Sequence, residues 1–389
     1  MAHDRERKDW IAGAMREEQF DCAIATLPEN VLLLTGYFPV VGTSIALADS
    51  TGISLLVPED ERGLAEKGGA DEVISFEPAS LSRLTAAAEA AREPLSQLIQ
   101  KRRLNTGAIA YDGGEACEPA SYASMHLYGN SILDLCSGVS LIAGTQFWAR
   151  MRSTLTIQEL ERLRRACRIA GKAFEAGRQA LHAGLLETTA AASFREPLFT
   201  EAIGFEGVSR AEGYVSCMAG EHSAHAHGAY ARSRRSAIGQ NDFVLIHCNS
   251  HADGYWTDIT RTYCLDSPVG KREQMRRAVF EAREAALAAI RPGARASDVD
   301  KAARDVMHRC GLGDAFKHST GHGVGFSAID PNALPRLHPL SPDLLAPGMV
   351  LNVEPAAYVE GAGGFRHCDV VTVTRTGVEV LTPFQCSPE

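Results

Sequence analysis

The fold is decided by the stretch Val244-Leu-Ile-His-Cys-Asn-Ser-His-Ala-Asp-Gly-Tyr-Trp-Thr-Asp-Ile-Thr-Arg-Thr-Tyr263. Apolar and β-branched residues at its two ends flank a polar centre that carries Asp253-Gly254. This pattern predicts two antiparallel strands joined by a tight turn. His247 and Asp258 stand almost symmetrically about that turn. We therefore expect them to face each other across the ladder and to reach one pocket.

The whole chain has 389 residues, of which 45% are hydrophobic and 22% charged. This length and composition are typical of a soluble globular protein of two or three domains. The net charge of −9 argues against nucleic-acid binding, because a basic surface would be expected there. We expect no signal peptide and no membrane span, since the opening is charged and no apolar run is long enough. The ten cysteines are scattered, which favours reduced thiols and a cytoplasmic protein.

The chain divides near residue 152. Before it, helix and strand patterns alternate, which predicts an α/β layer with a packing or dimerisation role. There we expect a strand at Ser131–Leu135 and a helix at Gly138–Arg152. Thr156-Ile-Gln-Glu159 is a capping box, and it predicts the start of a long helix that opens the second unit. Helix pairs then alternate with strand pairs, so the overall class is α/β (α+β), with domains at 1–152 and 153–389.

Side chains that bind metals or move protons gather at five places in the second unit. One is the hairpin, and another is a loop with three histidines that ends at His227. The other three are the glycine-rich loop Phe316–Gly325 with His318 and His322, Glu354 just before a proline, and Arg366-His-Cys-Asp369. The glycines of Phe316–Gly325 would let the backbone approach a ligand closely.

Three motifs occur in the same order as in a known family: Gly254–Tyr263, Gly321–Gly325 and Gly348–Pro355. They resemble the "pita-bread" metallopeptidases (M24), which include methionine aminopeptidase, aminopeptidase P, prolidase and creatinase. The resemblance implies a pita-bread domain at 153–389 and a creatinase- or prolidase-like domain at 1–152. It also implies a homodimer in which the N-terminal domain of one subunit reaches over the other's active site.

In active peptidases of this family five ligands, Asp, Asp, His, Glu and Glu, hold two divalent metals. The resemblance places the second Asp at Asp258, the His at His322 and the first Glu at Glu354. The first Asp falls on His247 and the last Glu on Cys368. A neutral imidazole cannot bridge two metals, and Cys368 removes a hard oxygen ligand. The two-metal site is therefore not expected.

Two kinds of site remain open. A single metal, zinc or manganese, would be held by Asp258, His322 and Glu354 with Cys368 or His247 as a fourth ligand. Alternatively the pocket is metal-free, as in creatinase, where histidines perform the catalysis.

The predicted roles follow from the same motifs. His227 matches a loop histidine that contacts substrate in the peptidases and does acid–base work in creatinase, so it is the candidate general acid or base. The other candidate catalytic residues are His247, Asp258, His322 and Glu354. The candidate substrate-binding residues are His318, Arg366 and Trp256. Taken alone, Cys368 is typical of a core-filling residue, and a rim or core role suits Trp256 equally.

We therefore expect a hydrolase that cleaves a C–N bond in a small, polar, amide- or amidine-like substrate. One alternative is a metal-dependent Xaa-Pro dipeptidase or aminopeptidase that acts on peptides. A second is a lyase acting on a small zwitterion. A third is a non-catalytic, peptidase-like binding module.

Overall fold

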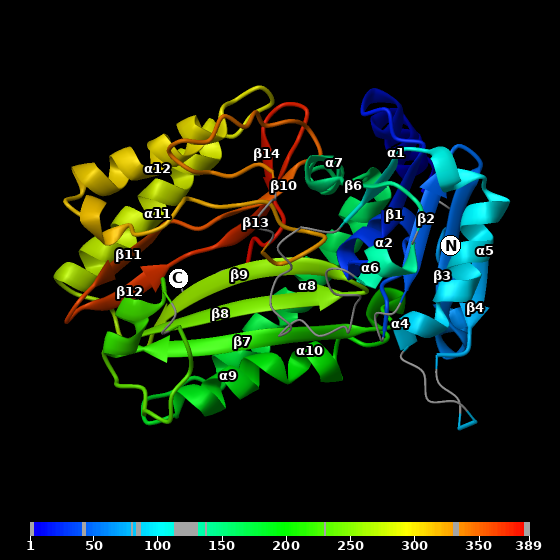
Figure 1. Ribbon diagram of the computed structural model, residues 1–389. Helices are drawn as coiled ribbons and strands as arrows, with labels where there is room; N and C mark the ends of the chain where they lie inside the picture. The colour runs from blue at the N-terminus through cyan, green and yellow to red at the C-terminus, as the bar shows by residue number, and fades with distance from the viewer. Residues whose placement is uncertain are drawn as a thin grey trace. The chain divides into compact units, whose positions relative to one another are not determined.

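The computed structural model describes residues 4–40, 44–78, 81–82, 87–112, 131–136, 138–228, 231–329 and 334–384. The chain separates into two compact units, Met1–Arg152 and Ser153–Glu389 (Figure 1). Each unit has its own sheets, one in the described part of the first unit and three in that of the second, and its own hydrophobic core. In the described parts of the chain, no helix combines the length and the apolar character needed to cross a membrane.

Within its described residues, the first unit contains a mixed six-stranded sheet in the order β4-β3-β2-β1-β5-β6. The strands are β1 Cys22–Ala25, β2 Ile45–Asp49, β3 Gly52–Pro58, β4 Glu72–Phe76, β5 Ile109–Tyr111 and β6 Leu141–Ala143. The helices are α1 Arg5–Glu17, α2 Pro28–Thr35, α3 Arg62–Ala65, α4 Ala87–Ala90, α5 Arg92–Lys101, α6 Ser131–Leu135 and α7 Thr145–Arg152. The central strands are buried on both faces, because helices cover the sheet on each side.

Two of the expected elements in this unit are wrong. Ser131–Leu135 is the helix α6 and not a strand, because Ile132 and Leu135, three positions apart, are both buried on one helical face. The expected helix at Gly138–Arg152 is divided. Its first part is the strand β6, and the helix α7 begins only at Thr145.

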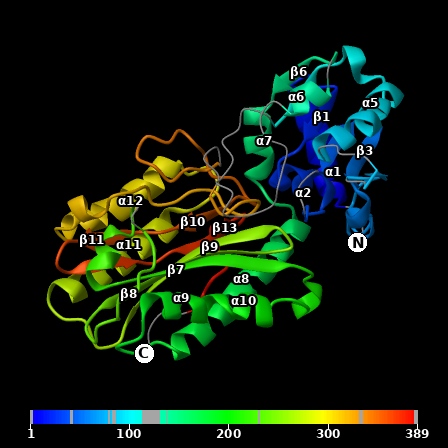
Figure 2. The ribbon, with the colours of Figure 1, turned by 60° about the horizontal axis from the view of Figure 1, so that its bottom comes forward.

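The second unit opens with the long helix α8 Ile157–Gln179, and the predicted capping box is present. The Thr156 hydroxyl accepts a hydrogen bond from the backbone N–H of Glu159, and the Glu159 carboxylate accepts one from that of Thr156. The helices α9 Glu187–Arg195 and α10 Pro197–Thr200 follow. Figures 1 and 2 show these three helices on one side of the sheet β7-β8-β9.

That sheet contains the hairpin, with β7 Ala211–Ala219, β8 Phe243–Ala252 and β9 Tyr255–Cys264. Asp253 and Gly254 form the turn with φ angles of 48° and 87°, as a tight two-residue hairpin turn requires. The predicted hairpin is thus confirmed, but its predicted register is wrong. His247 lies opposite Thr260, and Asp258 lies opposite Asn249. His247 and Asp258 are diagonal neighbours on one face, because the turn is centred one position later than expected.

The remaining elements cover the other face of this sheet. They are α11 Lys271–Ala289, α12 Ala296–Arg309, β10 Val350–Val353, β11 Ala356–Val359, β12 Gly363–Arg366, β13 Asp369–Val373 and β14 Val378–Val380. Strands β10, β13 and β14 form one sheet, and β11 pairs with β12. Helices α11 and α12 lie on the outer side of these strands (Figures 1 and 2). Short 3-10 turns occur at Glu59–Glu61, Leu104–Thr106, Phe205–Gly207, Gly220–His225 and Gly313–Ala315.

The two layers are tied together at β9. The Arg366 N–H donates to the Thr262 hydroxyl at 3.0 Å, and the Cys368 N–H donates to the Thr260 carbonyl at 3.0 Å. On the opposite, helix-covered face of β9, Arg261 is buried and forms an ion pair with Asp369 at 2.7 Å. Because of these links, residues 366–368 lie against the site-bearing face of the hairpin.

Candidate active site

Backbone hydrogen bonds bring three motifs to one place. The Asn352 N–H donates to the His322 carbonyl at 2.9 Å, and the Glu354 N–H donates to the Thr320 carbonyl at 2.8 Å. Gly321 is required between them, because a Cβ there would lie 2.0 Å from the carbonyl oxygen of Asn352. The glycine-rich loop thus runs beside the end of β10, and both face β9.

Asp258 is the centre of the cluster, and it is buried. Its Oδ1 lies 3.6 Å from Nδ1 of His247, and its Oδ2 lies 3.5 Å from Nε2 of His322. Burial alone would raise the pKa of Asp258, but His247, His322 and Arg366 lower the pKa overall. Asp258 is therefore a carboxylate at neutral pH.

The two histidines beside it differ in charge. Burial lowers the pKa of His247 to about 4, so its imidazole is neutral, and its Nδ1 lies 3.0 Å from the Thr260 hydroxyl. Burial also opposes the charge on His322, but the hydrogen bond to Asp258 and the charges of Glu354 and Asp258 raise its pKa to about 9. One environment thus holds two imidazoles in opposite protonation states.

Asn352 fixes the orientation of His322. Its Oδ1 accepts the His322 backbone N–H at 2.7 Å, and its Nδ2 lies 3.1 Å from Nε2 of the same residue. The NH₂ group of Asn352 points a hydrogen at Nε2 of His322, which disfavours a proton on that nitrogen. The carboxylates of Asp258 and Glu354 lie within 4.0 Å of the same nitrogen, and their full negative charges outweigh the amide dipole, so the proton stays. Asn352 was not among the predicted site residues. Its position on β10, two residues before Glu354 at the end of that strand, was the available signal.

Glu354 and Arg366 form the second half of the cluster. Glu354 Oε1 lies 4.0 Å from His322 Nε2, and Glu354 Oε2 lies 4.0 Å from Arg366 Nη1. Burial raises the pKa of Glu354 to about 7. Arg366 is buried, and its Nε donates to the Thr260 hydroxyl at 3.0 Å. A permanent cation therefore stands among the carboxylates.

A chain of aromatic side chains leads from Arg366 towards solvent. Arg366 Nη1 donates to the Tyr358 hydroxyl at 3.4 Å, and that hydroxyl lies 3.0 Å from His318 Nε2. His318 Nδ1 lies 2.8 Å from the Ser319 carbonyl, which can only accept, so Nε2 accepts the Tyr358 proton. The ring of His227 lies 4.9 Å from that of Tyr358. Sequence reasoning missed Tyr358, although it lies on the short strand directly after Glu354.

His227 is the exposed member of this group. Partial burial of its ring and the nearby charges of Lys317, His225 and Arg366 lower its pKa, so it is neutral and able to accept a proton. The candidate base is thus placed where a substrate could reach it.

Of the other predicted residues, Cys368 adjoins Asp258, whereas Trp256 packs elsewhere. Cys368 is fully buried, and its Sγ donates to the Asp258 carbonyl at 3.2 Å and lies 3.9 Å from Asp258 Oδ1. Burial raises its pKa well above the usual value, so it is a thiol and not a thiolate. His367 contacts Asp369 at 3.2 Å instead of the cluster. Trp256 shares a face of β9 with Asp258, but it is buried with its ring 4.5 Å from that of His251.

The donor set does not fit a pair of divalent metals. Among the described residues around Asp258, the only other carboxylate is that of Glu354, whereas His247 and Cys368 supply an imidazole and a thiol, which cannot bridge two metals as a carboxylate does. Within the part of the chain that the structure describes, no three His, Cys, Asp or Glu side chains are grouped so as to hold a metal ion.

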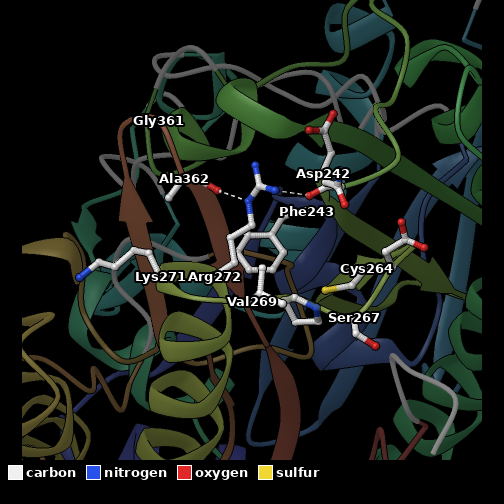
Figure 3. Close-up of a pocket in the computed structure, with 12 residues that line it drawn as sticks. Asp242, Phe243, Cys264, Ser267, Val269, Lys271, Arg272, Gly361 and Ala362 are labelled. Carbon is white, nitrogen blue, oxygen red and sulfur yellow. Dashed lines mark hydrogen bonds between the residues drawn. The ribbon is translucent and has the colours of Figure 1, made fainter.

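A separate hollow of about 410 Å³ lies at the start of α11 (Figure 3). Arg272 crosses it, donating from Nε to the Ala362 carbonyl at 3.1 Å and from Nη1 to the Asn241 carbonyl. These bonds to backbone carbonyls hold the guanidinium in place. None of the predicted site residues lines it.

Comparison with known proteins identifies the class. Residues 161–375 match the model of metallopeptidase family M24. The chain belongs to this family of hydrolases, which confirms the family and the enzyme class expected from the motifs. It is 28% identical to the Xaa-Pro dipeptidase of Pyrococcus furiosus, over 97% of this chain and 98% of that protein.

Solved structures confirm the pita-bread fold class. The prolidase of Pyrococcus horikoshii superposes with a TM-score of 0.77 at 24% identity, covering 98% of this chain and 99% of that one. The Xaa-Pro dipeptidase of Bacillus anthracis gives 0.78 at 22% identity, covering 98% of both chains.

Proposed function

We propose that this M24 hydrolase cleaves a C–N bond of a small polar substrate with protein acid–base groups instead of a pair of metal ions. The observation that carries the proposal is the donor set around Asp258. A neutral imidazole, His247, and a buried thiol, Cys368, stand beside Asp258, at the two positions where the resemblance to the family's peptidases would place carboxylates. Neither group offers the charged oxygens that two dications share.

The charge balance of the cluster supports the same proposal. Asp258 and Glu354 bring at most two negative charges, which the guanidinium of Arg366 and the imidazolium of His322 already balance. A dinuclear centre would add four positive charges to this buried place. Burying uncompensated charge is costly, so the cluster suits a substrate of low net charge.

His227 would act on water in this proposal. Its neutral imidazole accepts a proton from a water molecule, and the water oxygen bonds to the carbon of the scissile C–N bond. The C–N electron pair leaves with the nitrogen, which receives the proton back from the His227 imidazolium. The lowered pKa of His227 supports the first step, because the ring is free to accept a proton at neutral pH.

The buried residues would bind and orient the substrate. Arg366 is held by Thr260 and Tyr358, so its guanidinium is positioned to stabilise negative charge on an oxygen of the reacting carbon. Glu354, with a pKa of about 7, would anchor an N–H group or share a proton with it. His318 would orient Tyr358.

A second candidate is hydrolysis of Xaa-Pro dipeptides with bound metal. The full-length similarity to the Xaa-Pro dipeptidase of Pyrococcus furiosus favours it. In that case Asp258, His322 and Glu354, which are not grouped as a metal-ligand set among the described residues, would have to draw together around a single zinc or manganese ion, which would supply the activation of water.

Metal analysis of the purified protein by plasma mass spectrometry separates the two candidates. The proposal expects substoichiometric divalent metal and turnover of amides or ureides that a chelator leaves unchanged. Near-stoichiometric metal, with Xaa-Pro cleavage abolished by the chelator, would replace it with the second candidate. The homodimer and the cytoplasmic location expected from the sequence stay predictions.

A further inference from the structure

Asn249 carries a buried side-chain amide that takes no part in the hydrogen bonds of the cluster. It is 1% exposed, and neither its Oδ1 nor its Nδ2 has a hydrogen-bond partner among the described residues. Nearly all buried side-chain amides in folded proteins are paired, because an unpaired one loses its bonds to water without replacement. An orphan amide in a core therefore calls for a partner other than the protein's own described groups.

The register places this amide at the candidate active site. Asn249 lies directly opposite Asp258 on β9 and two positions after His247 on β8, so all three share one face of the hairpin. Residues in such a direct pair have Cβ atoms about 5 Å apart. The carboxylate oxygens of Asp258 lie near His247 and His322, so Asp258 leaves the amide unpaired.

The face beside the amide is partly open, because the side chain of His247, two positions before Asn249, is 26% exposed. Asn249 itself is covered, so contact with a ligand requires its side chain to turn about the Cα–Cβ bond. Two rotamers about this bond are common in strands, and the turn is therefore a modest change.

We propose that Asn249 is a substrate-binding residue that selects a neutral carboxamide or ureide group over a guanidinium or amidinium group. Its Nδ2 donates to the carbonyl oxygen of the ligand, and its Oδ1 accepts the adjacent N–H. A guanidinium offers only donors and would leave Nδ2 without an acceptor. This deepens the proposed function and rests on it, since it chooses between the amide- and amidine-like substrates.

Calorimetric binding of N-carbamoylglycine and guanidinoacetate tests the proposal, because the two compounds differ only in C=O against C=NH₂⁺. The wild type is expected to prefer N-carbamoylglycine. Asn249→Leu has nearly the same shape without the polar atoms and should weaken that binding by roughly tenfold. Asn249→Asp keeps an acceptor and loses the donor, so it should shift the preference towards guanidinoacetate.

Thermal unfolding distinguishes binding from a structural role. Asn249→Leu removes an unpaired amide, so the variant should be as stable as the wild type or more stable. The matched control is Ser250→Ala on the opposite face of β8, where the hydroxyl is already bonded to Thr257 at 2.9 Å. That variant should lose stability and bind N-carbamoylglycine like the wild type.

The proposal is overturned if the wild type binds both compounds equally, binds neither at millimolar concentration, or loses no affinity on Asn249→Leu. Binding is measured without turnover and at controlled metal content, so the result does not depend on the reaction catalysed. If the protein proved to be a metal-dependent dipeptidase, the proposed function would be refuted, but the comparison of the two ligands would still decide the role of Asn249.

Discussion

His247 and Asp258 are diagonal neighbours across the β8–β9 ladder, with Nδ1 of one 3.6 Å from Oδ1 of the other. The residue directly opposite His247 is Thr260, whose hydroxyl lies within 3.0 Å of His247 Nδ1 and of Arg366 Nε. Asp258 is thus surrounded by nitrogen atoms from three different motifs. These nitrogen atoms stabilise the carboxylate form of Asp258 without a metal.

Adding two carboxylates beside Asp258 should create a metal site. The double variant His247→Asp/Cys368→Glu would supply the five-ligand set that the family resemblance implies, and it is expected to bind divalent manganese or cobalt that the wild type does not retain. Equilibrium dialysis followed by metal analysis measures this. Each single variant is the control, and circular dichroism checks the fold. If the wild type retained as much metal as the double variant, His247 and Cys368 would not be what prevents metal binding.

Removing the exposed imidazole should stop turnover without unfolding the protein. His227→Gln is expected to lower kcat by roughly a hundredfold or more, the usual contribution of a general base. The matched control is His225→Gln in the same exposed loop, which should keep most of the activity. Steady-state kinetics on the substrate found active measures both. Similar losses in the two variants would show that the loop, and not the His227 imidazole, matters.

The charge of His322 should make stability depend on pH. Its pKa rises from 6.5 to about 9 on folding, so the folded state holds this proton more tightly. The resulting stabilisation is fully present below pH 6.5 and is lost as the pH rises through about 9. Urea unfolding of the wild type and of His322→Gln from pH 6 to pH 10 should show a stability difference that shrinks over this range. A difference independent of pH would mean that His322 is neutral.

The close approach of the glycine-rich loop to β10 should not tolerate a side chain. Gly321→Ala would place a methyl group 2.0 Å from the Asn352 carbonyl oxygen, so we expect about 1–3 kcal/mol of destabilisation and a displaced His322. Gly377→Ala is the control, because nothing lies within 4 Å of the added carbon. Chemical denaturation and activity are measured for both. Equal stability of the two variants would count against the contact.

Motifs predicted the part of the site that depends on local sequence. Asp258, His322 and Glu354 come together as expected, because each lies in a strand or turn whose form is set by its neighbours. Tyr358, Asn352 and Thr260 were missed, since their roles come from contacts between segments far apart in the chain.

The errors in the fold have similar causes. The hairpin was predicted correctly, but an error of one position in the turn centre changed every cross-strand partner. Ser131–Leu135 has the apolar content of a strand, and only its packing in the first unit shows that it is a helix.

The two faces of strand β9 have different roles, one at the candidate site and one in the core. Asp258 and Thr260 face the candidate site, whereas Ile259 and Arg261 on the other face are buried, and Arg261 is paired with Asp369. Natural variation could therefore remodel the chemistry at every second residue without disturbing the scaffold. Position 247 on the adjoining strand is of the same kind, since His247 faces the site while its neighbours Ile246 and Cys248 pack in the core.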